Sequence, residues 1–421
     1  MSEILETVTI EKLVHGGQGL GTLASGQKAF IWNALPNETV RARVIRRKRS
    51  FVEAIAEEIV VASAERITPT EENYLSTSPW QIMNFAAENE YKKAIVAELF
   101  AQEKVVLPTL TPVIHDDRQQ HYRNKMEYSF WGDDDGLHLA LHRRGSHGKQ
   151  IVQGSSLAML VLDAGANSIA VQLSSLGMRA GDLKTIIVRS NQRGETVAAL
   201  YTKLESFKKL TLPPELKGLR VYHSNPRSPA SVATKLLYEL GDATLQDELL
   251  GKIFTYDVDS FFQVNLPVYE QALQTIKNSL EAPNLVDMYA GVGSIGLSVA
   301  TERVGLIELD AATAAMGRLN ATSSGLQAEV VEASTEKVLE YITGECPVIF
   351  DPPRAGLHEK IITRVLEAKP RQIVYLSCNP ATHARDLAKL QEAYIVKTLT
   401  IYNFFPRTPH IETLALLELV Q

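Results

Sequence analysis

Short apolar runs alternate with helical stretches from about residue 254 to the C-terminus, and this alternation constrains the fold more than any other feature. The runs include NLVDMYAG, RVGLIEL, AEVVEA, PVIFDPP and QIVYLSC. Apolar runs of this length, separated by helices, are typical of buried strands in a doubly wound, mostly parallel α/β sheet. Such sheets bind ligands at the carboxyl ends of their strands, so the residues after each run are the candidate site residues.

The first of these runs ends in a glycine-rich turn within 284-NLVDMYAGVGSIGLSVA-300. Gly291 and Gly293 let the backbone approach a ligand closely, and Glu308, at the end of the next strand, can accept hydrogen bonds from ribose hydroxyls. Dinucleotide-binding enzymes share this glycine spacing, so the turn alone leaves a dinucleotide and a methyl donor as alternatives. Its place at the start of a C-terminal domain, followed by IFDPPR, favours S-adenosylmethionine.

Three further strand ends carry reactive groups. Asp351 follows one run and is fixed by two prolines, Cys378 follows another, and Glu412 begins the last strand. A carboxylate that enters an apolar strand loses hydration, which raises its pKa and makes it a better base. Each residue also has a simpler interpretation. Asp351 would belong to a rigid structural turn, Cys378 would be a small buried hydrophobic residue, and Glu412 would be an ordinary surface glutamate.

The rest of the chain predicts two additional domains, which agrees with its length of 421 residues. Residues 1–60 contain about five short alternating runs separated by turn residues, typical of a small OB-like barrel. Residues 61–252 predict an α+β domain built from antiparallel hairpins, with a helix over 86–104 that packs on the catalytic domain. Residues 253–421 then form the α/β domain.

A basic run lies in the predicted barrel. It consists of Arg41, Arg43, Arg46, Arg47, Lys48 and Arg49, whereas the whole chain has a net charge of −6. Basic clusters attract phosphate backbones without reading base sequence, so this run is a candidate RNA-binding surface. The alternative is an ordinary solvated strand face.

Composition limits the cellular context. The chain has two cysteines, its apolar runs are too short to span a membrane, and MSEILETVTIEK lacks the apolar core of a secretory signal. We therefore expect a cytoplasmic protein without a disulfide framework or a metal site, and we expect it to be a monomer.

Five motifs together resemble the bacterial RNA uracil-5-methyltransferase family. In chain order they are FFQVN (261–265), DMYAGVGSIG, FDPPRAG, YLSCNPAT and FPRTPHIE. The resemblance covers nearly the whole chain. It implies an N-terminal TRAM-type barrel, a central domain and a C-terminal Rossmann-like class I methyltransferase domain.

The resemblance also implies a reaction. Cys378 would be the nucleophile that attacks carbon 6 of uracil, and Glu412 would accept the proton from carbon 5. The pocket for S-adenosylmethionine and the base would be lined by Gln263, Tyr289, Gly291, Gly293, Ser294, Glu308 and Asp351. The substrate would be a uridine in structured RNA, with 23S rRNA favoured over tRNA.

Two features depart from the family pattern. Ser334 stands where the family often has an acid. Many members carry an iron–sulfur cluster on four cysteines, but the matching stretches TPTEENYLSTSPWQ and GKQIVQGSSLAML contain none, and serines such as Ser78 stand there instead. We therefore expect no iron–sulfur cluster.

Other functions stay open on the residues alone. A cytosine-5 RNA methyltransferase also needs a cysteine, although Ser377 precedes Cys378 here in place of the usual proline. Arg354 disfavours an amino-methyltransferase, which has an aromatic residue at that position. An RNA-binding or chaperone protein with an inactive methyltransferase domain and a dinucleotide oxidoreductase are the remaining alternatives.

Overall fold

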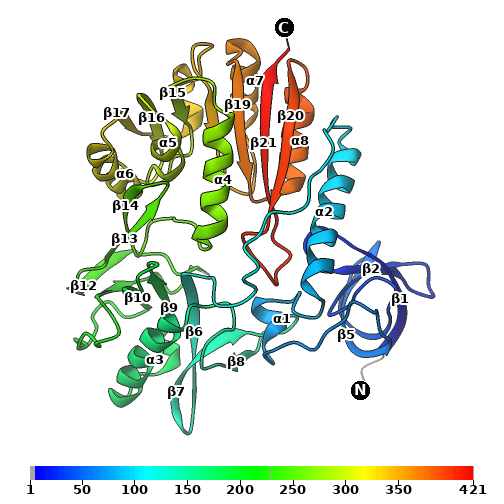
Figure 1. Ribbon diagram of the computed structural model, residues 1–421. Coiled ribbons are helices and arrows are strands. Elements are labelled where there is room, and N and C mark those ends of the chain that lie inside the picture. The colour runs from blue at the N-terminus through cyan, green and yellow to red at the C-terminus, as the bar shows by residue number, and fades with distance from the viewer. Residues whose placement is uncertain (1–4, 229, 421) are drawn as a thin grey trace. The chain divides into compact units, whose positions relative to one another are not determined.

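The computed structural model of the protein describes residues 5–228 and 230–420 and divides into two compact units (Figure 1). The first unit contains residues 1–95, 118–243 and 405–409, and the second contains the remainder. Residues 1–4 of the predicted barrel domain lie outside the described residues.

The N-terminal strands form a closed barrel, as predicted. They are β1 (Leu5–Leu13), β2 (Gly19–Thr22), β3 (Lys28–Trp32), β4 (Thr39–Arg47) and β5 (Phe51–Val61), in the order β1-β2-β3-β5-β4. Alternate side chains point inward, so Val8, Ile10, Val40 and Ala42 are buried. The period-two pattern of the sequence therefore fills the barrel interior.

The first unit also contains a seven-stranded sheet in the order β12-β11-β10-β9-β6-β7-β8. Its strands are β6 (Lys125–Asp133), β7 (Gly136–His142), β8 (Lys149–Ile151), β9 (Leu183–Ser190), β10 (Thr196–Thr202), β11 (Gly218–His223) and β12 (Lys235–Gly241). Helix α3 (Leu160–Ser175) packs against β7, β9 and β10, and a 3-10 turn (Ala180–Asp182) precedes β9.

The prediction of antiparallel hairpins throughout this domain is wrong for one pair of strands. β10 and β11 are parallel, with Val197 paired to Gly218 and Thr202 to His223. The segment between the two strands, residues 203–217, is long enough to return the chain to the starting edge of the sheet.

Hydrogen bonds join the stretches TPTEENYLSTSPWQ and GKQIVQGSSLAML, where the resemblance would place cluster cysteines. Around the short helix α1 (Tyr74–Thr77), one carboxylate oxygen of Glu71 accepts hydrogen bonds from Thr77, Ser78 and Gln81 at 3.0–3.1 Å. The other accepts one from the backbone N–H of Ser156 at 2.7 Å. Gln81 also donates to the Ser156 hydroxyl, at 2.9 Å. A carboxylate therefore connects residues that are far apart in sequence.

The second unit contains the predicted doubly wound sheet, in the order β17-β16-β15-β18-β19-β21-β20. Its strands are β15 (Asn284–Asp287), β16 (Arg303–Glu308), β17 (Gln327–Glu332), β18 (Val348–Phe350), β19 (Gln372–Ser377), β20 (Tyr394–Tyr402) and β21 (Glu412–Leu419). Neighbouring strands are parallel except for β21, which is antiparallel to both β19 and β20.

Helices cover both faces of this sheet, with α4 on one face and α7 and α8 on the other (Figure 1). The helices are α4 (Leu266–Ser279), α5 (Ser294–Val299), α6 (Ala311–Ser323), α7 (Glu359–Ala368) and α8 (Pro380–Leu390), with 3-10 turns at Thr335–Lys337 and Leu339–Tyr341. Helices on both faces bury both sides of the strands, which explains their continuous apolar runs.

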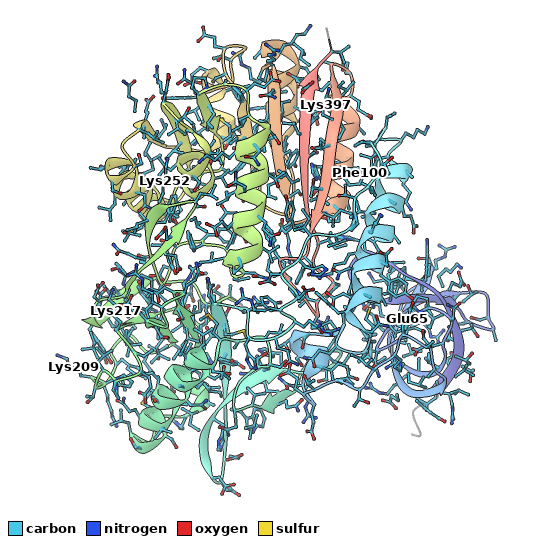
Figure 2. All side chains as sticks on the ribbon, in the orientation of Figure 1. Glu65, Phe100, Lys209, Lys217, Lys252 and Lys397 are labelled. Carbon is cyan, nitrogen blue, oxygen red and sulfur yellow. The ribbon has the colours of Figure 1, made fainter. Side chains whose placement is uncertain are left out.

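The second unit starts at Thr244 with the hairpin of β13 (Thr244–Leu249) and β14 (Lys252–Asp257). The domain boundary predicted at residue 253 falls inside this hairpin. Helix α2 (Phe85–Gln102) belongs to the first unit as far as Ile95 and to the second from Val96. In the second unit its Phe100, labelled in Figure 2, contacts the imidazole of His383 edge-on, with ring centroids 5.7 Å apart.

We predict that Glu71→Ala lowers the free energy of unfolding by about 2–4 kcal/mol, because it leaves several donors near buried Ser78 without their acceptor. Urea denaturation monitored by circular dichroism measures this loss. The exposed neighbour Glu72 supplies the control, and Glu72→Ala should change stability by less than about 0.5 kcal/mol. Equal stabilities for the two variants would show that the Glu71 contacts are unimportant.

Candidate active site

Four acidic or nucleophilic side chains lie at one edge of the sheet in the second unit. Asp287 ends β15, while Asp351 and Cys378 directly follow β18 and β19. The parallel strands end at this edge, whereas the antiparallel strand β21 begins there with Glu412. Ser377 pairs with Thr413, so the same register places Cys378 opposite Glu412.

Glu412 is deeply buried, with 2% of its surface exposed, and its Oε2 has no hydrogen-bond partner among the described residues. Burial raises the pKa of this carboxyl well above its usual range, the nearby Asp351 raises it further, and Arg354 opposes the shift. The direction is the one expected for a carboxylate that enters an apolar strand. An unpaired buried oxygen is therefore available to accept a proton or a hydrogen bond from a ligand.

The thiol of Cys378 is half-buried. Burial raises its pKa to about 12, with additional contributions from Glu412 and Asp351, while Arg354 lowers it. In this state the side chain is a neutral thiol at neutral pH, and a cation near Sγ would favour the reactive thiolate.

Asp351 and Asp287 behave similarly. Burial and the neighbouring Asp287 raise the pKa of Asp351 to about 8. Burial and Glu308 raise the pKa of Asp287 to about 7, although hydrogen bonds from the backbone of Gly296 and Tyr289 oppose this shift. Asp287 accepts a hydrogen bond from the backbone of Gly296 at 3.0 Å. Several carboxyl groups thus share a poorly hydrated space, which suits a ligand that brings positive charge or hydrogen-bond donors.

The glycine-rich turn lies at the same edge. Gly291 and Gly293 have φ of +56° and +86°, a left-handed conformation that favours glycine. Nothing lies within 4 Å of the position that a Cβ of Gly291 would occupy, so its backbone is open to a ligand. Glu308 accepts a hydrogen bond from Gly291 N at 2.9 Å and another from Asp310 N at 2.7 Å. This carboxylate therefore fixes the turn and keeps lone pairs for hydroxyl groups.

The remaining predicted pocket residues lie around this turn and α4. Tyr289 is half-buried and lies two residues after the end of β15. Ser294 begins α5 and shares a 2.8 Å hydrogen bond with the buried Tyr269 of α4. Gln263 is 7% exposed and lies between β14 and α4. Two residues later, Asn265 donates to the carbonyl of Phe404 at 3.2 Å, which joins the FFQVN and FPRTPHIE motifs.

Arg354 lies at this edge too. Its sequence position was used only as evidence against an amino-methyltransferase, and it was not predicted as a site residue. Its guanidinium lies 3.2 Å from Nδ1 of His410, and its carbonyl accepts hydrogen bonds from Asn379 and Thr382 at 2.8 and 3.1 Å. It lowers the pKa of both Cys378 and Glu412. Its position two residues after the Asp-Pro strand end was the signal that pointed to it.

His383 on α8 was not singled out by sequence analysis. Its Nδ1 lies 2.7 Å from the Thr413 hydroxyl, which in turn donates to the carbonyl of Ser377 at 3.4 Å. Burial lowers the pKa of His383 to about 3, so the imidazole is neutral. It supports the two strand ends that carry Cys378 and Glu412.

The basic run of the barrel lies on β4 and on the turn that follows it. Arg41, Arg43 and Arg46 form ion pairs with glutamates of β5, and Arg47 with a glutamate of β1; the partners are Glu58, Glu57, Glu53 and Glu6, at 2.9, 2.5, 3.7 and 2.9 Å. Lys48 lies 5.3 Å from the ring centroid of Phe51, and Arg49 is exposed. The run is therefore partly neutralised within the barrel.

The described part of the chain, residues 5–228 and 230–420, can be assessed for metal-binding groups and for membrane-spanning helices. No group of three or more His, Cys, Asp or Glu residues there has an arrangement suited to a metal ion. None of the helices described there has both the length and the apolar character needed to cross a membrane.

Several known proteins resemble this chain in sequence. Residues 337–420 match the family described as tRNA (uracil-5-)-methyltransferase. An uncharacterized RNA methyltransferase of Fusobacterium nucleatum is 26% identical over 99% of this chain and 96% of its own. One from Thermotoga maritima is 28% identical over 97% of this chain and 98% of its own.

A solved structure shares the fold. The crystal structure of a Pyrococcus abyssi tRNA (uracil-54, C5)-methyltransferase in complex with S-adenosyl-L-homocysteine has a TM-score of 0.77. It is 22% identical and covers 97% of this chain and 99% of its own.

The charges around Cys378 predict opposite effects of two substitutions on its reactivity. Asp351→Asn removes a negative charge that disfavours the thiolate, so the pKa should fall and alkylation by iodoacetamide at about pH 9 should accelerate about tenfold. Arg354→Ala removes the opposing cation, so alkylation should slow.

A Cys346→Ser background leaves one thiol to be measured by mass spectrometry. Changes of the same sign in both variants would rule out electrostatic control by these two residues.

Proposed function

We propose that the chain is a member of the RNA uracil-5-methyltransferase family and that it methylates carbon 5 of a uridine in structured RNA. The observation that supports the proposal most strongly is the pairing of β19 with β21: Cys378 directly follows one strand, the buried Glu412 begins the other, and the two groups interact electrostatically. A nucleophile for carbon 6 and a proton acceptor for carbon 5 must lie close together, because these atoms are neighbours in the uracil ring.

S-adenosylmethionine fits the residues at this edge. The open backbone of Gly291 and the carboxylate of Glu308 suit the nucleoside, and the buried acids suit a cationic ligand. Tyr289, Ser294 and Gln263 would complete the pocket. When bound, the cofactor supplies an electrophilic methyl group on a sulfonium.

Covalent catalysis overcomes the low nucleophilicity of uracil carbon 5. Cys378 first loses its thiol proton to solvent. The thiolate Sγ then bonds to carbon 6, and the displaced ring electrons form an enolate, which makes carbon 5 electron-rich. Asp351, protonated at neutral pH because of its raised pKa, donates a hydrogen bond that stabilises the enolate oxygen. After methylation, Glu412 takes the proton from carbon 5, the ring double bond re-forms and Sγ leaves.

The domains divide the work in this proposal. The second unit would perform the reaction, while the barrel and its Arg41–Arg49 run would bind phosphate groups away from the reacting base. A uridine must leave its stack to reach a strand-edge site, so the substrate would be an unpaired or flipped base. An RNA substrate would place the reaction in the cytoplasm. The Glu71 hydrogen bonds would make an iron–sulfur cluster unnecessary in the first unit.

Both RNA classes need testing as substrates. The resemblance favours 23S rRNA, whereas the Pyrococcus abyssi protein is a tRNA methyltransferase. Unmodified transcripts of both would be incubated with the protein and S-adenosylmethionine, digested and examined by nucleoside mass spectrometry.

We expect 5-methyluridine from the wild type and none from Cys378→Ala. Glu412→Gln should accumulate a protein–RNA adduct on denaturing gels, because the step that releases the thiol needs the base. 5-Methylcytidine would instead favour a cytosine-5 enzyme. The absence of any methylated nucleoside would favour an RNA-binding protein with an inactive domain.

For the barrel, we predict that Arg46→Glu combined with Arg47→Glu weakens RNA binding and leaves cofactor affinity unchanged. Loss of two phosphate contacts should reduce the slope of log affinity against log salt by about 2. Filter binding over a salt series measures this slope. Lys208→Glu with Lys209→Glu, a pair outside the barrel, is the charge-matched control, and equal slopes in the two double variants would refute the assignment.

A further inference from the structure

A five-residue segment of the FPRTPHIE motif, Phe405–Pro409, lies between β20 and β21. The strands on either side of it, β20 and β21, belong to the second unit, but the segment itself groups with the first unit. Glu412, the first residue of β21, follows Pro409 after two intervening residues. Three peptide steps span at most about 11 Å, so whatever fixes the segment also limits where Glu412 can lie.

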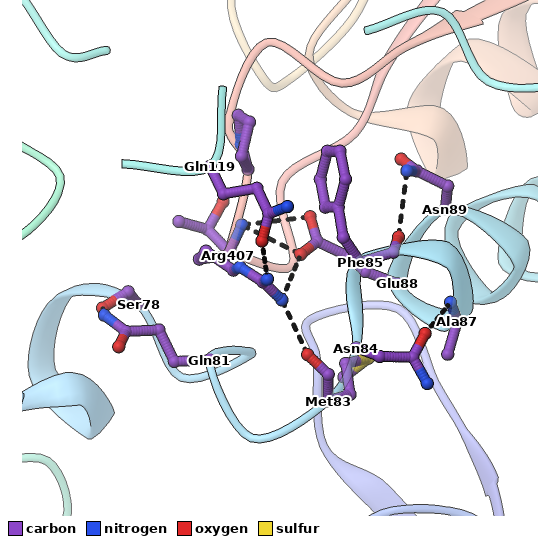
Figure 3. A network of polar contacts seen from close by, with 12 residues as sticks. Ser78, Gln81, Met83, Asn84, Phe85, Ala87, Glu88, Asn89, Gln119 and Arg407 are labelled. Carbon is purple, nitrogen blue, oxygen red and sulfur yellow. Dashed lines mark hydrogen bonds and ion pairs between the residues drawn. The ribbon is translucent and has the colours of Figure 1, made fainter. Parts of the chain in front are cut away.

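The backbone of Arg407 is bound from two sides within the first unit. Both carboxylate oxygens of Glu88 on α2 lie 3.0 Å from its N–H (Figure 3). The backbone N–H of Trp80 donates to its carbonyl at 3.1 Å. The backbone N–H and carbonyl of Arg407 thus both form hydrogen bonds with residues more than 300 positions earlier in the chain.

The residues next to Arg407 are bound in the same way. Nζ of Lys92 donates to the carbonyl of Phe405 at 3.1 Å, and the hydroxyl of Tyr122 donates to the carbonyl of Pro406 at 3.0 Å. Gly17 of the barrel has no room for a side chain, because its Cβ would lie 2.4 Å from the ring of Pro409. Residues of the barrel, α2 and the central sheet domain therefore all contact the segment.

The side chain of Arg407 adds to these contacts. Its guanidinium donates to the carbonyl of Met83 at 2.6 Å, bonds to Gln119 and lies 3.7 Å from Glu88 (Figure 3). Glu88 and Lys92 form a 3.0 Å ion pair and are fully buried, and Arg407 is 6% exposed. Burying three charges has a large desolvation cost, so such clusters are weak stabilisers, and a single defined geometry is their better-supported benefit.

The backbone conformation also indicates a position fixed by its surroundings. Arg407 has a φ of +65°, which is unfavourable for a residue with a side chain and persists only where neighbouring contacts enforce it. The contacts from Glu88 and Trp80 flank this peptide unit directly.

We infer that Glu88 and Arg407 are positioning residues for Glu412: by holding the Phe405–Pro409 segment, they limit where the proton acceptor, three residues further along the chain, can lie. The inference rests on the proposed function. Its chemical consequence is specific to one step, because Glu412 acts only after carbon 5 has been methylated. Misplacement of the base should slow release of Cys378 from the product and leave adduct formation intact.

The test compares Glu88→Gln with the wild type, using the RNA that yields 5-methyluridine. The substitution removes the charge but keeps the shape of the side chain. At saturating RNA and cofactor we expect turnover to fall about tenfold to a hundredfold, with KM for RNA within about twofold. The protein–RNA adduct seen with Glu412→Gln should accumulate on denaturing gels. Glu90→Gln, an exposed glutamate on the same helix, is the control and should behave as the wild type.

Two results would overturn the inference: wild-type turnover in Glu88→Gln, or lower activity without adduct. If Glu88→Gln fails to fold, Arg407→Gly carries the same test, since it keeps the N–H that Glu88 binds and tolerates positive φ. An absence of 5-methyluridine from the wild type itself would refute the proposed function, and the inference with it.

Discussion

The antiparallel pairing of β21 between β19 and β20 determines the chemistry that this sheet edge can perform. In an all-parallel sheet, only carboxyl ends of strands meet at the binding edge, and the residue that begins a strand lies at the opposite edge. Reversal of the last strand brings Glu412, its first residue, to the edge where β19 ends before Cys378. A one-residue slip in this register would turn Glu412 to the other face of the sheet, so the thiol and carboxyl would no longer face each other.

The same edge shows how burial and charge work against each other. Dehydration raises the pKa of Asp287, Asp351, Cys378 and Glu412, so the site favours protonated forms. Arg354 opposes this trend at the thiol and at Glu412. A proton donor such as Asp351 gains from burial, whereas a base and a nucleophile are hindered by it. The positive charge of Arg354 partly offsets the effect of burial on the pKa of Cys378 and Glu412, and it does so without bringing water into the pocket.

Local sequence patterns predicted much of the fold and of the candidate site. The doubly wound sheet and the barrel could be predicted because each strand and turn is encoded within a few residues, and strand ends in such sheets converge by topology. The edge residues Asp351, Cys378 and Glu412 follow from that convergence. The parallel pairing of β10 with β11 was missed, since it depends on how residues 203–217 cross the sheet.

Interactions between distant segments left weaker traces in the sequence. The ion pairs of the basic run could not be predicted from the sequence, because its glutamate partners lie on neighbouring strands and bulges interrupt the register of β4 with β5. The strand end at Asp351 was a local signal for Arg354 but not for its contact with His410, and no local pattern indicated His383, which acts through Thr413.

The buried cluster of Glu88, Lys92 and Arg407 also restricts how this protein can evolve. Replacing Glu88 leaves the charges of Lys92 and Arg407 in the interior without their shared carboxylate, which typically costs about 3–5 kcal/mol. A comparable cost applies at each intermediate, so a lineage cannot exchange these residues one at a time without passing through poorly folded proteins. The α2 segment that carries Glu88 and Lys92 and the distant segment that carries Arg407 are therefore expected to change together in evolution.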